Sequence, residues 1–126
     1  SLLTFGILSS NIHMAWMRLV AGRLEMRYRY SKDIVYNTFP MPKITKQVEL
    51  RIKETAKGIL AVRDKYKDLT LADLYGKKWS AYIDLVEAHR VNDVAVMEAY
   101  GFSPDMDDDE CIIELIKLYS KIIDKN

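Results

Sequence analysis

The chain has 126 residues, with 49% hydrophobic and 29% charged residues and only 5 Gly and 3 Pro. This length suits one domain, or one small domain with part of a neighbour, and excludes an enzyme assembled from several domains. The composition excludes disordered, collagen-like and low-complexity chains, and a formal net charge of +1 taken alone argues against a strongly charged partner. Because the sequence opens at Ser1 without Met, we expect it to be a piece of a longer protein.

The first predicted element is a helix over about residues 10–25. Ser9 and Ser10 are suitable N-cap residues, and the apolar residues that follow recur at the three- and four-residue spacing of one helical face. These apolar residues are Ile12, Ala15, Trp16, Leu19, Val20 and Leu24.

Two short strands, or extended segments, are predicted next. Arg27-Tyr-Arg-Tyr-Ser31 alternates basic and aromatic residues, and Ile34-Val-Tyr36 follows a Lys32-Asp33 turn. Pro40 and Pro42 then exclude a continuing helix or a central strand. We therefore predict a domain boundary here, with residues 1–42 ending one domain and residues 43–126 forming a second.

The second domain is predicted to be helical throughout. Its first helix spans about residues 43–66 and has an inward apolar stripe, formed by Ile44, Val48, Ile52, Ala56, Ile59 and Leu60. A short helix capped by Thr70 is expected next, followed by a helix over about residues 81–100 that ends at Gly101.

An acidic cluster, Asp105 and Asp107–Glu110, precedes the last predicted helix. Carboxylates at a helix N-terminus interact favourably with the helix dipole, so we interpret the cluster as a solvated cap in preference to a metal site. The inward residues of this helix are Ile112, Leu115, Tyr119, Ile122 and Ile123. The predicted fold class is mainly α: a small helical bundle-like domain preceded by a helix and a short β hairpin or extended segment.

Residues that could carry catalysis or bind a metal are sparse. Cys111 is the single cysteine, which excludes an internal disulfide and a Cys-based zinc cluster and fits a reducing, cytoplasmic setting. Neither His13 nor His89 has a Cys or second His at metal-ligand spacing, and no nucleotide-binding, metalloprotease or nucleophile-elbow motif occurs. The uncharged stretch Ser1–Met17 is too short and polar to span a bilayer. We expect no catalytic residue, metal site or membrane contact in this chain.

The balanced net charge conceals two oppositely charged halves. Residues 1–67 contain 13 basic and 5 acidic residues, a charge of +8, whereas residues 68–126 contain 6 and 13, a charge of −7. This asymmetry indicates either an anionic partner for the basic half or mutual attraction of the halves.

The most basic stretch of the chain runs from Arg18 to Lys32, where Glu25 is the one acidic residue. Basic groups neutralise phosphates, arginine reads guanine O6 and N7, and glutamate accepts from cytosine N4. A solvated helix end with buried tyrosines explains this pattern equally well.

The order of motifs along the chain resembles one family over nearly its whole length. The first set resembles the end of the target recognition domain in MmeI-like DNA methyltransferases: Phe5-Gly-Ile-Leu-Ser-Ser10, His13-Met-Ala-Trp16, Gly22-Arg-Leu-Glu25, Tyr28-Arg-Tyr-Ser31 and Val35-Tyr-Asn-Thr-Phe-Pro-Met-Pro42. The second set resembles the helical C-terminal domain of those proteins: Ala56-Lys-Gly-Ile-Leu60, Leu71-Ala-Asp-Leu-Tyr75, Ala88-His-Arg-Val-Asn-Asp93 and Ala99-Tyr-Gly-Phe102.

The resemblance implies a parent protein that is an S-adenosylmethionine-dependent DNA adenine-N6 methyltransferase, in some members a restriction-modification enzyme. Its catalytic domain and cofactor site would lie upstream of Ser1, and the partners of this chain would be double-stranded DNA and the rest of the methyltransferase. In the family, the acidic and basic positions that match Glu25 and Arg27 contact one base pair of the recognition site, and a Glu/Arg pair suits C·G.

The remaining motif residues are assigned by the same resemblance and by their place on helices. Arg23, Arg29 and Lys32 are expected to contact the DNA backbone or support the base contacts. His13 and Trp16 are expected to be packing residues, and the motif residues His89, Asn92 and Asp93 are expected to cap and bridge neighbouring helices. The alternative function is a helical protein–protein interaction or oligomerisation module without DNA contact.

Overall fold

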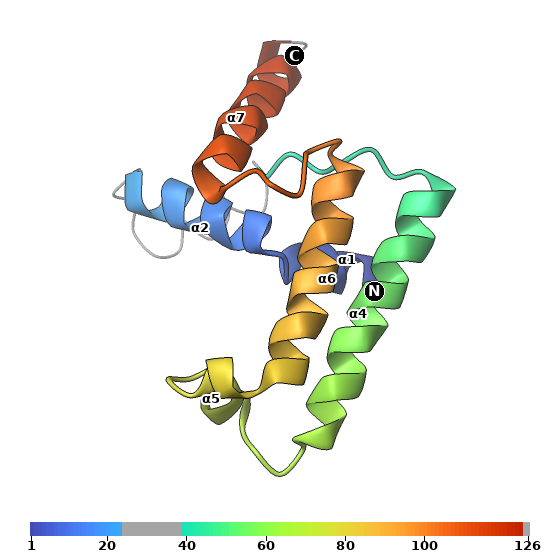
Figure 1. The fold of residues 1–126 in the computed structure, drawn as a ribbon. Helices are drawn as coiled ribbons and strands as arrows, with labels where there is room; N and C mark the ends of the chain where they lie inside the picture. The colour runs from blue at the N-terminus through green and yellow to red at the C-terminus, as the bar shows by residue number, and fades with distance from the viewer. Residues whose placement is uncertain (24–38, 125–126) are drawn as a thin grey trace. The chain divides into compact units, whose positions relative to one another are not determined.

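The computed structural model describes residues 1–23 and 39–124 of the chain (Figure 1). All regular structure in these two stretches is helical, which confirms the predicted mainly α class. The elements are α1 (Leu2–Leu8), α2 (Asn11–Arg23), α4 (Lys46–Lys65), α5 (Leu71–Leu74), the short 3-10 turn η1 (Trp79–Ala81), α6 (Ile83–Ala99) and α7 (Asp108–Asp124). The predicted β hairpin or extended segment lies outside the described residues.

Two compact units make up the chain, and neither is one continuous stretch of sequence. The first contains Ser1–Ser10 and Ile44–Val96, and the second contains Asn11–Lys43 and Met97–Asn126. No helix in the described part of the chain is long and apolar enough to cross a membrane.

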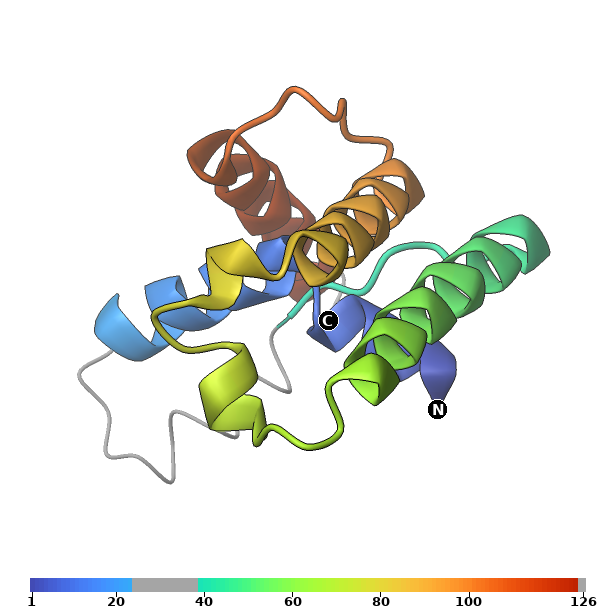
Figure 2. The ribbon, with the colours of Figure 1, turned by 60° about the horizontal axis from the view of Figure 1, so that its bottom comes forward.

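In the first unit, α4 and α6 lie side by side, as both Figure 1 and Figure 2 show. Helix α1 packs against α4, and the core between these elements is built from fully buried aliphatic side chains. They are Ile7, Ile52, Ile59, Leu74 and Leu85. Hydrophobic burial of this kind is the main stabilising contribution to the unit.

Helix α1 is an element that the sequence pattern did not predict. Gly6 lies at its contact with the other helices: a methyl group there would come within 2.5 Å of Ile52 Cγ2 and 3.2 Å of Asn92 Oδ1. The glycine therefore allows the backbone of α1 to approach α4 and α6 closely. Asn92 uses this proximity, because its side-chain amide donates to the Gly6 carbonyl at 2.8 Å.

The predicted cap at Thr70 and the predicted end at Gly101 are confirmed. Helix α4 begins at Lys46 and not at about residue 43, so Ile44, predicted to belong to its inward stripe, precedes the helix and is 38% exposed. Thr45 Oγ1 accepts from the Val48 amide at 3.1 Å at the start of α4, and Thr70 Oγ1 accepts from the Asp73 amide at 3.1 Å at the start of α5. Such caps satisfy amides that have no intrahelical partner. After α6, Gly101 has a φ of 77°, the left-handed conformation that favours glycine.

Two predicted inward stripes extend further than the structure supports. On α4, Ile52, Ala56 and Ile59 are fully buried, but Leu60 is 40% exposed, because the buried face is centred closer to Thr55, which is also buried. On α7, Leu115 is fully buried whereas Ile123 is 50% exposed.

The second unit pairs α2 with α7. Of the apolar face predicted for α2, Ile12, Ala15, Trp16 and Val20 are buried. Leu19 is half-buried, and Leu24 lies outside the described residues. On α7 the buried residues are Cys111 and Leu115. Cys111 therefore packs in the interior of this unit, where burial raises the pKa of its thiol, as do the carboxylates near it.

Candidate nucleic-acid interface

The residues predicted to contact DNA fall almost entirely outside the described part of the chain. Glu25, Arg27, Arg29 and Lys32 belong to residues 24–38, and Arg23 is the last residue of α2. The structure therefore does not test these assignments. It does describe the residues on either side of this segment, where the chain leaves α2 and where it resumes at Phe39.

On the leading side, polar contacts join α2 to the start of α7. The Asn11 side-chain amide donates to Asp108 Oδ1 at 2.7 Å, and Arg18 forms an ion pair with Asp108 at 3.5 Å. Arg18 belongs to the basic stretch identified in the sequence, but here its charge faces a carboxylate. These contacts hold the part of α2 that precedes Arg23 against the start of α7.

On the trailing side, Phe39 is anchored in a cluster of aromatic rings within the second unit. Its ring meets His13 edge to face with centroids 4.8 Å apart, and it meets Trp16 and Tyr100 at 6.2 and 6.4 Å. The ring of Tyr119, on α7, meets the ring of Trp16 edge to face with centroids 6.1 Å apart, which joins α7 to the cluster. Edge-to-face contacts at these distances are favourable aromatic geometries.

A hydrogen bond fixes the residue that follows. The Tyr100 hydroxyl donates to the Pro40 carbonyl at 2.6 Å, and the Tyr100 ring stacks on Phe102. Burial raises the pKa of Tyr100 above its ordinary value, so the hydroxyl keeps the proton that it donates. The chain is thus held on both sides of residues 24–38 by one cluster of side chains.

His13 and Trp16 serve this cluster, as predicted, by packing. They are 5% and 3% exposed, and both contact Phe39. Their place in the family-like motif is therefore explained by this contact, which holds Phe39 against α2 directly after the predicted DNA-contacting segment.

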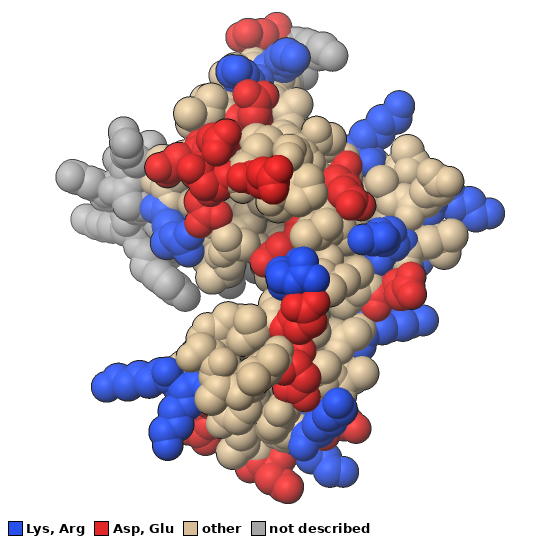
Figure 3. All heavy atoms as spheres, viewed as in Figure 1, with Lys and Arg blue, Asp and Glu red and all other residues tan. Residues whose placement is uncertain are grey.

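The acidic cluster caps α7, as predicted. Asp107 Oδ1 accepts from the Glu110 amide at 2.8 Å, and Glu110 Oε1 accepts from the Asp107 amide at 3.3 Å. This is a reciprocal capping arrangement. Acidic side chains gather over the beginning of α7 in Figure 3, and within the described residues no group of His, Cys, Asp and Glu could hold a metal ion.

In the first unit, Asn92 and His89 bridge neighbouring elements, as predicted. Asn92 joins α6 to α1 through Gly6 and to α4 through Thr55, whose hydroxyl donates to Asn92 Oδ1 at 2.8 Å. His89 joins α6 to the end of α5, because its Nε2 lies 2.7 Å from the Tyr75 hydroxyl.

The Tyr75 hydroxyl also accepts from Arg63 Nε at 2.8 Å. Since arginine can only donate, the Tyr75 proton is free to be donated to His89, an arrangement that favours a neutral imidazole with its proton on Nδ1. Desolvation by burial lowers the pKa of His89, and the positive charge of Arg63 lowers it further.

We predict a pH-dependent loss of stability from His89. Because its pKa is lowered in the folded state, the unfolded chain binds more protons below an ordinary pKa of about 6.5. The free energy of unfolding should therefore fall as the pH drops from 7.5 to 5.5. In His89→Gln, whose amide oxygen can still accept from Tyr75, the fall should be smaller. Urea unfolding at several pH values measures the difference, and equal slopes in the two proteins would contradict the prediction.

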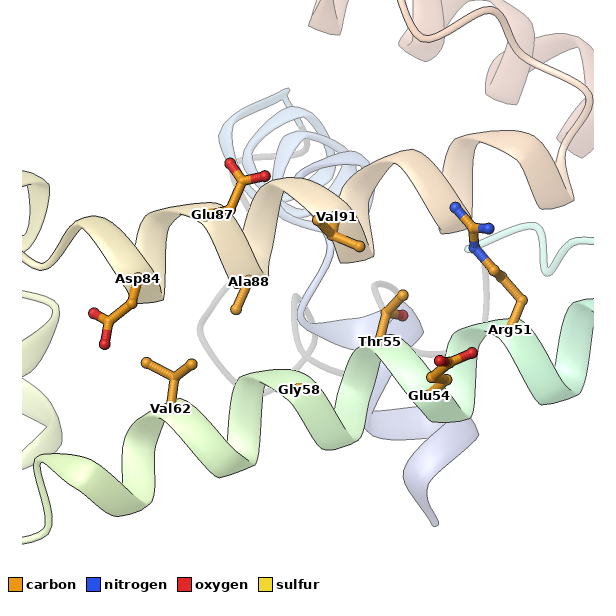
Figure 4. A pocket seen from close by; sticks show the side chains of 9 residues that line it. All are labelled: Arg51, Glu54, Thr55, Gly58, Val62, Asp84, Glu87, Ala88 and Val91. Atoms are coloured by element: carbon orange, nitrogen blue, oxygen red, sulfur yellow. The ribbon is translucent and has the colours of Figure 1, made fainter.

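The sequence pattern did not reveal a groove of about 510 Å³ between α4 and α6 (Figure 4). Gly58 and Ala88, which carry little or no side chain, leave space between the two helices, and charged side chains also line the groove. Of these, Asp84 accepts from the Tyr66 hydroxyl at 2.8 Å, the main cause of its lowered pKa, and Glu87 forms an ion pair with Arg90 at 2.6 Å. Both of these carboxylates therefore already have partners within the first unit.

Both parts of the chain are similar to domains of the same protein. Residues 1–43 match the family described as MmeI, target recognition domain, and residues 41–125 match MmeI, C-terminal domain. DNA methyltransferase A of Bacillus subtilis (strain 168) is 38% identical over 120 residues, which is 95% of this chain and 13% of that protein.

A solved structure gives the same result. The Type IIL restriction-modification enzyme MmeI, solved in complex with DNA, matches with a TM-score of 0.86 and 41% identity over 98% of this chain. The match covers 16% of the MmeI chain, so this chain spans a small part of the length of both relatives.

Proposed function

Because this chain belongs to the MmeI family, we propose that it recognises DNA, without catalysing a reaction itself, as part of a site-specific DNA adenine-N6 methyltransferase. Residues 1–42 would end the target recognition domain and residues 43–126 would form the helical C-terminal domain that braces it on the duplex. Two observations support this division: the family matches meet at residues 41–43, and the related MmeI was solved in complex with DNA.

Within this proposal, Glu25 and Arg27 read one C·G base pair, while Arg23, Arg29 and Lys32 contact phosphates or support the reading residues. The observation that carries the assignment is the anchoring of the chain on both sides of residues 24–38, by α2 and by Phe39 in its aromatic cluster. Base readout depends on side chains held in a fixed register on the duplex, and the cluster supplies a rigid base for such a register.

The methyl donor S-adenosylmethionine would bind to the catalytic domain of the parent protein, and we assign no residue of this chain to it. When bound there, it supplies the methyl group for adenine N6. This chain would contribute the choice of site. The proposal also places the protein in the cytoplasm, where chromosomal DNA of a bacterial relative is found and where the free thiol of Cys111 is stable.

Titration of a labelled duplex with the full-length protein at several salt concentrations tests the proposal. Contact with phosphates predicts that the logarithm of the affinity falls linearly with the logarithm of the salt concentration, with a slope of about 0.9 per phosphate. A methyltransferase assay on the same duplexes should show methylation of adenine at a defined site. Absence of DNA binding at low salt would instead favour a protein-interaction module.

A further inference from the structure

One face of α4 carries three lysines that do not contribute to the packing of the first unit. Lys46, Lys53 and Lys57 lie within about 40° of arc on a helix of 3.6 residues per turn, about 130° around the helix from buried Ile52 and Ile59. We call these three residues the lysine face. Basic side chains project along this helix in Figure 3.

Two carboxylates lie near the lysine face: Glu49 beside it, and Asp64 on the same side of the helix seven residues beyond Lys57. Lys46 and Lys57 are exposed and have no ion-pair partner in the part of the chain that the structure describes. Lys53 pairs with Glu49 at 2.8 Å, but both side chains are 41% exposed, and exposed pairs of this kind are weak. Glu54 lines the groove beside α6 (Figure 4).

The spacing of the lysine face suits the phosphates of a nucleic acid. With a rise of 1.5 Å per residue, Lys53 and Lys57 are about 6 Å apart along the helix axis, and Lys46 and Lys53 about 10 Å apart. One DNA strand presents a phosphate about every 3.4 Å of its axis, so long, flexible lysine side chains can each reach a separate phosphate. Lysine binds phosphate as a point charge, which suits contact without base reading.

The lysine face is also tethered close to the proposed recognition segment. Lys32 and Lys46 are fourteen positions apart in the sequence, and an extended chain spans at most about 3.5 Å per residue. The two cannot be more than about 50 Å apart, which corresponds to about 15 base pairs. A duplex that continues for about 15 base pairs beyond the recognition segment is long enough to span this distance.

We propose that the lysine face of α4 is a second, sequence-independent contact with the DNA backbone. The inference rests on the proposed function, and it gives the helical C-terminal domain a direct part in DNA binding. The recognition segment selects the site, whereas Lys46, Lys53 and Lys57 add affinity equally at every sequence.

The test compares two triple variants of the full-length protein. The first is Lys46→Gln, Lys53→Gln and Lys57→Gln, which keeps residues of good helix propensity. The matched control is Lys67→Gln, Lys77→Gln and Lys78→Gln, which removes the same charge from three exposed lysines of the same unit. Because net charge changes equally, any difference between the variants reports the location of the lysines.

Loss of three phosphate contacts should lower the salt slope by about 2.7, so that the drop in affinity between 50 and 200 mM salt shrinks by about 40-fold. The methylated sequence should be unchanged, and the control should keep nearly the slope of the original protein. An unchanged slope in the first variant, or an equal reduction in both, would overturn this inference alone. If the unmodified protein showed no salt-dependent DNA binding, the proposed function would fail with it.

Discussion

Exchanging Glu25 and Arg27, as Glu25→Arg with Arg27→Glu in the full-length methyltransferase, is expected to reverse the base pair accepted at one position of the recognition site. Arginine reads guanine through O6 and N7, and glutamate accepts from cytosine N4. Interchanging the two side chains should therefore favour G·C where C·G was accepted. Each contact contributes about 1–3 kcal/mol of discrimination, or about 5- to 150-fold. Methylation of duplexes that differ only at this position measures the change.

Two comparisons make the result specific. The single variants Glu25→Arg and Arg27→Glu should methylate both duplexes poorly, because each leaves two like-charged residues opposite one base pair. Arg29→Gln and Lys32→Gln should weaken binding by a similar factor on every duplex, since phosphate contacts carry no sequence information. If the double variant kept the original preference, Glu25 and Arg27 would not be the reading residues.

The parts of the fold that the sequence predicts well are those with a local cause. The helices α4, α5, α6 and α7 follow from apolar periodicity together with caps such as Thr70 and Gly101, which act within a few residues of chain. The acidic cap of α7 is predicted for the same reason, since Asp107 and Glu110 satisfy each other's amides. None of these features depends on a distant partner.

The parts that sequence reasoning missed depend on contacts between distant residues. Helix α1 has one local signal, since Ser1 Oγ accepts from the Thr4 amide at 3.2 Å. Its packing, in which Gly6 fits against Ile52 and Asn92, depends on residues far away in the sequence. Likewise, the exposed positions of Leu60 and Ile123 follow from where neighbouring helices lie. A stripe on one helix predicts an apolar face, but its limits are set by the partner that covers it.

In the candidate site, too, the contacts between distant residues were not predicted from the sequence. The anchoring of Phe39 on His13, Trp16 and Tyr100 joins residues up to 87 positions apart in the sequence, so only the structure reveals that these motif residues act together. The roles of Glu25 and Arg27 come from chemistry and resemblance, and they remain a prediction. The structure adds a physical reason for the motif as a whole, since His13, Trp16 and Phe39 hold the chain on either side of the reading residues.

Replacing Asn92 by leucine is expected to destabilise the first unit by about 2–4 kcal/mol. Asn92 is fully buried, and its amide serves both α1 and α4. Leucine has a similar size but cannot donate to the Gly6 carbonyl or accept from the Thr55 hydroxyl. Thr55 can keep its second bond, to the Ile52 carbonyl at 3.0 Å, so the unsatisfied Gly6 carbonyl accounts for most of the loss. Urea unfolding of the 126-residue chain, followed by circular dichroism, measures the change.

Two further variants separate the lost hydrogen bonds from a general effect of the substitution. Asn11→Ala removes an exposed amide that donates to Asp108 and should cost less than about 1 kcal/mol, because water replaces the lost partner. Thr55→Val combined with Asn92→Leu should be less destabilising than the two single changes added together, since Thr55→Val leaves Asn92 Oδ1 without its donor and this oxygen is absent from the double variant. Strict additivity would show that the contact between Thr55 and Asn92 contributes nothing of its own to stability.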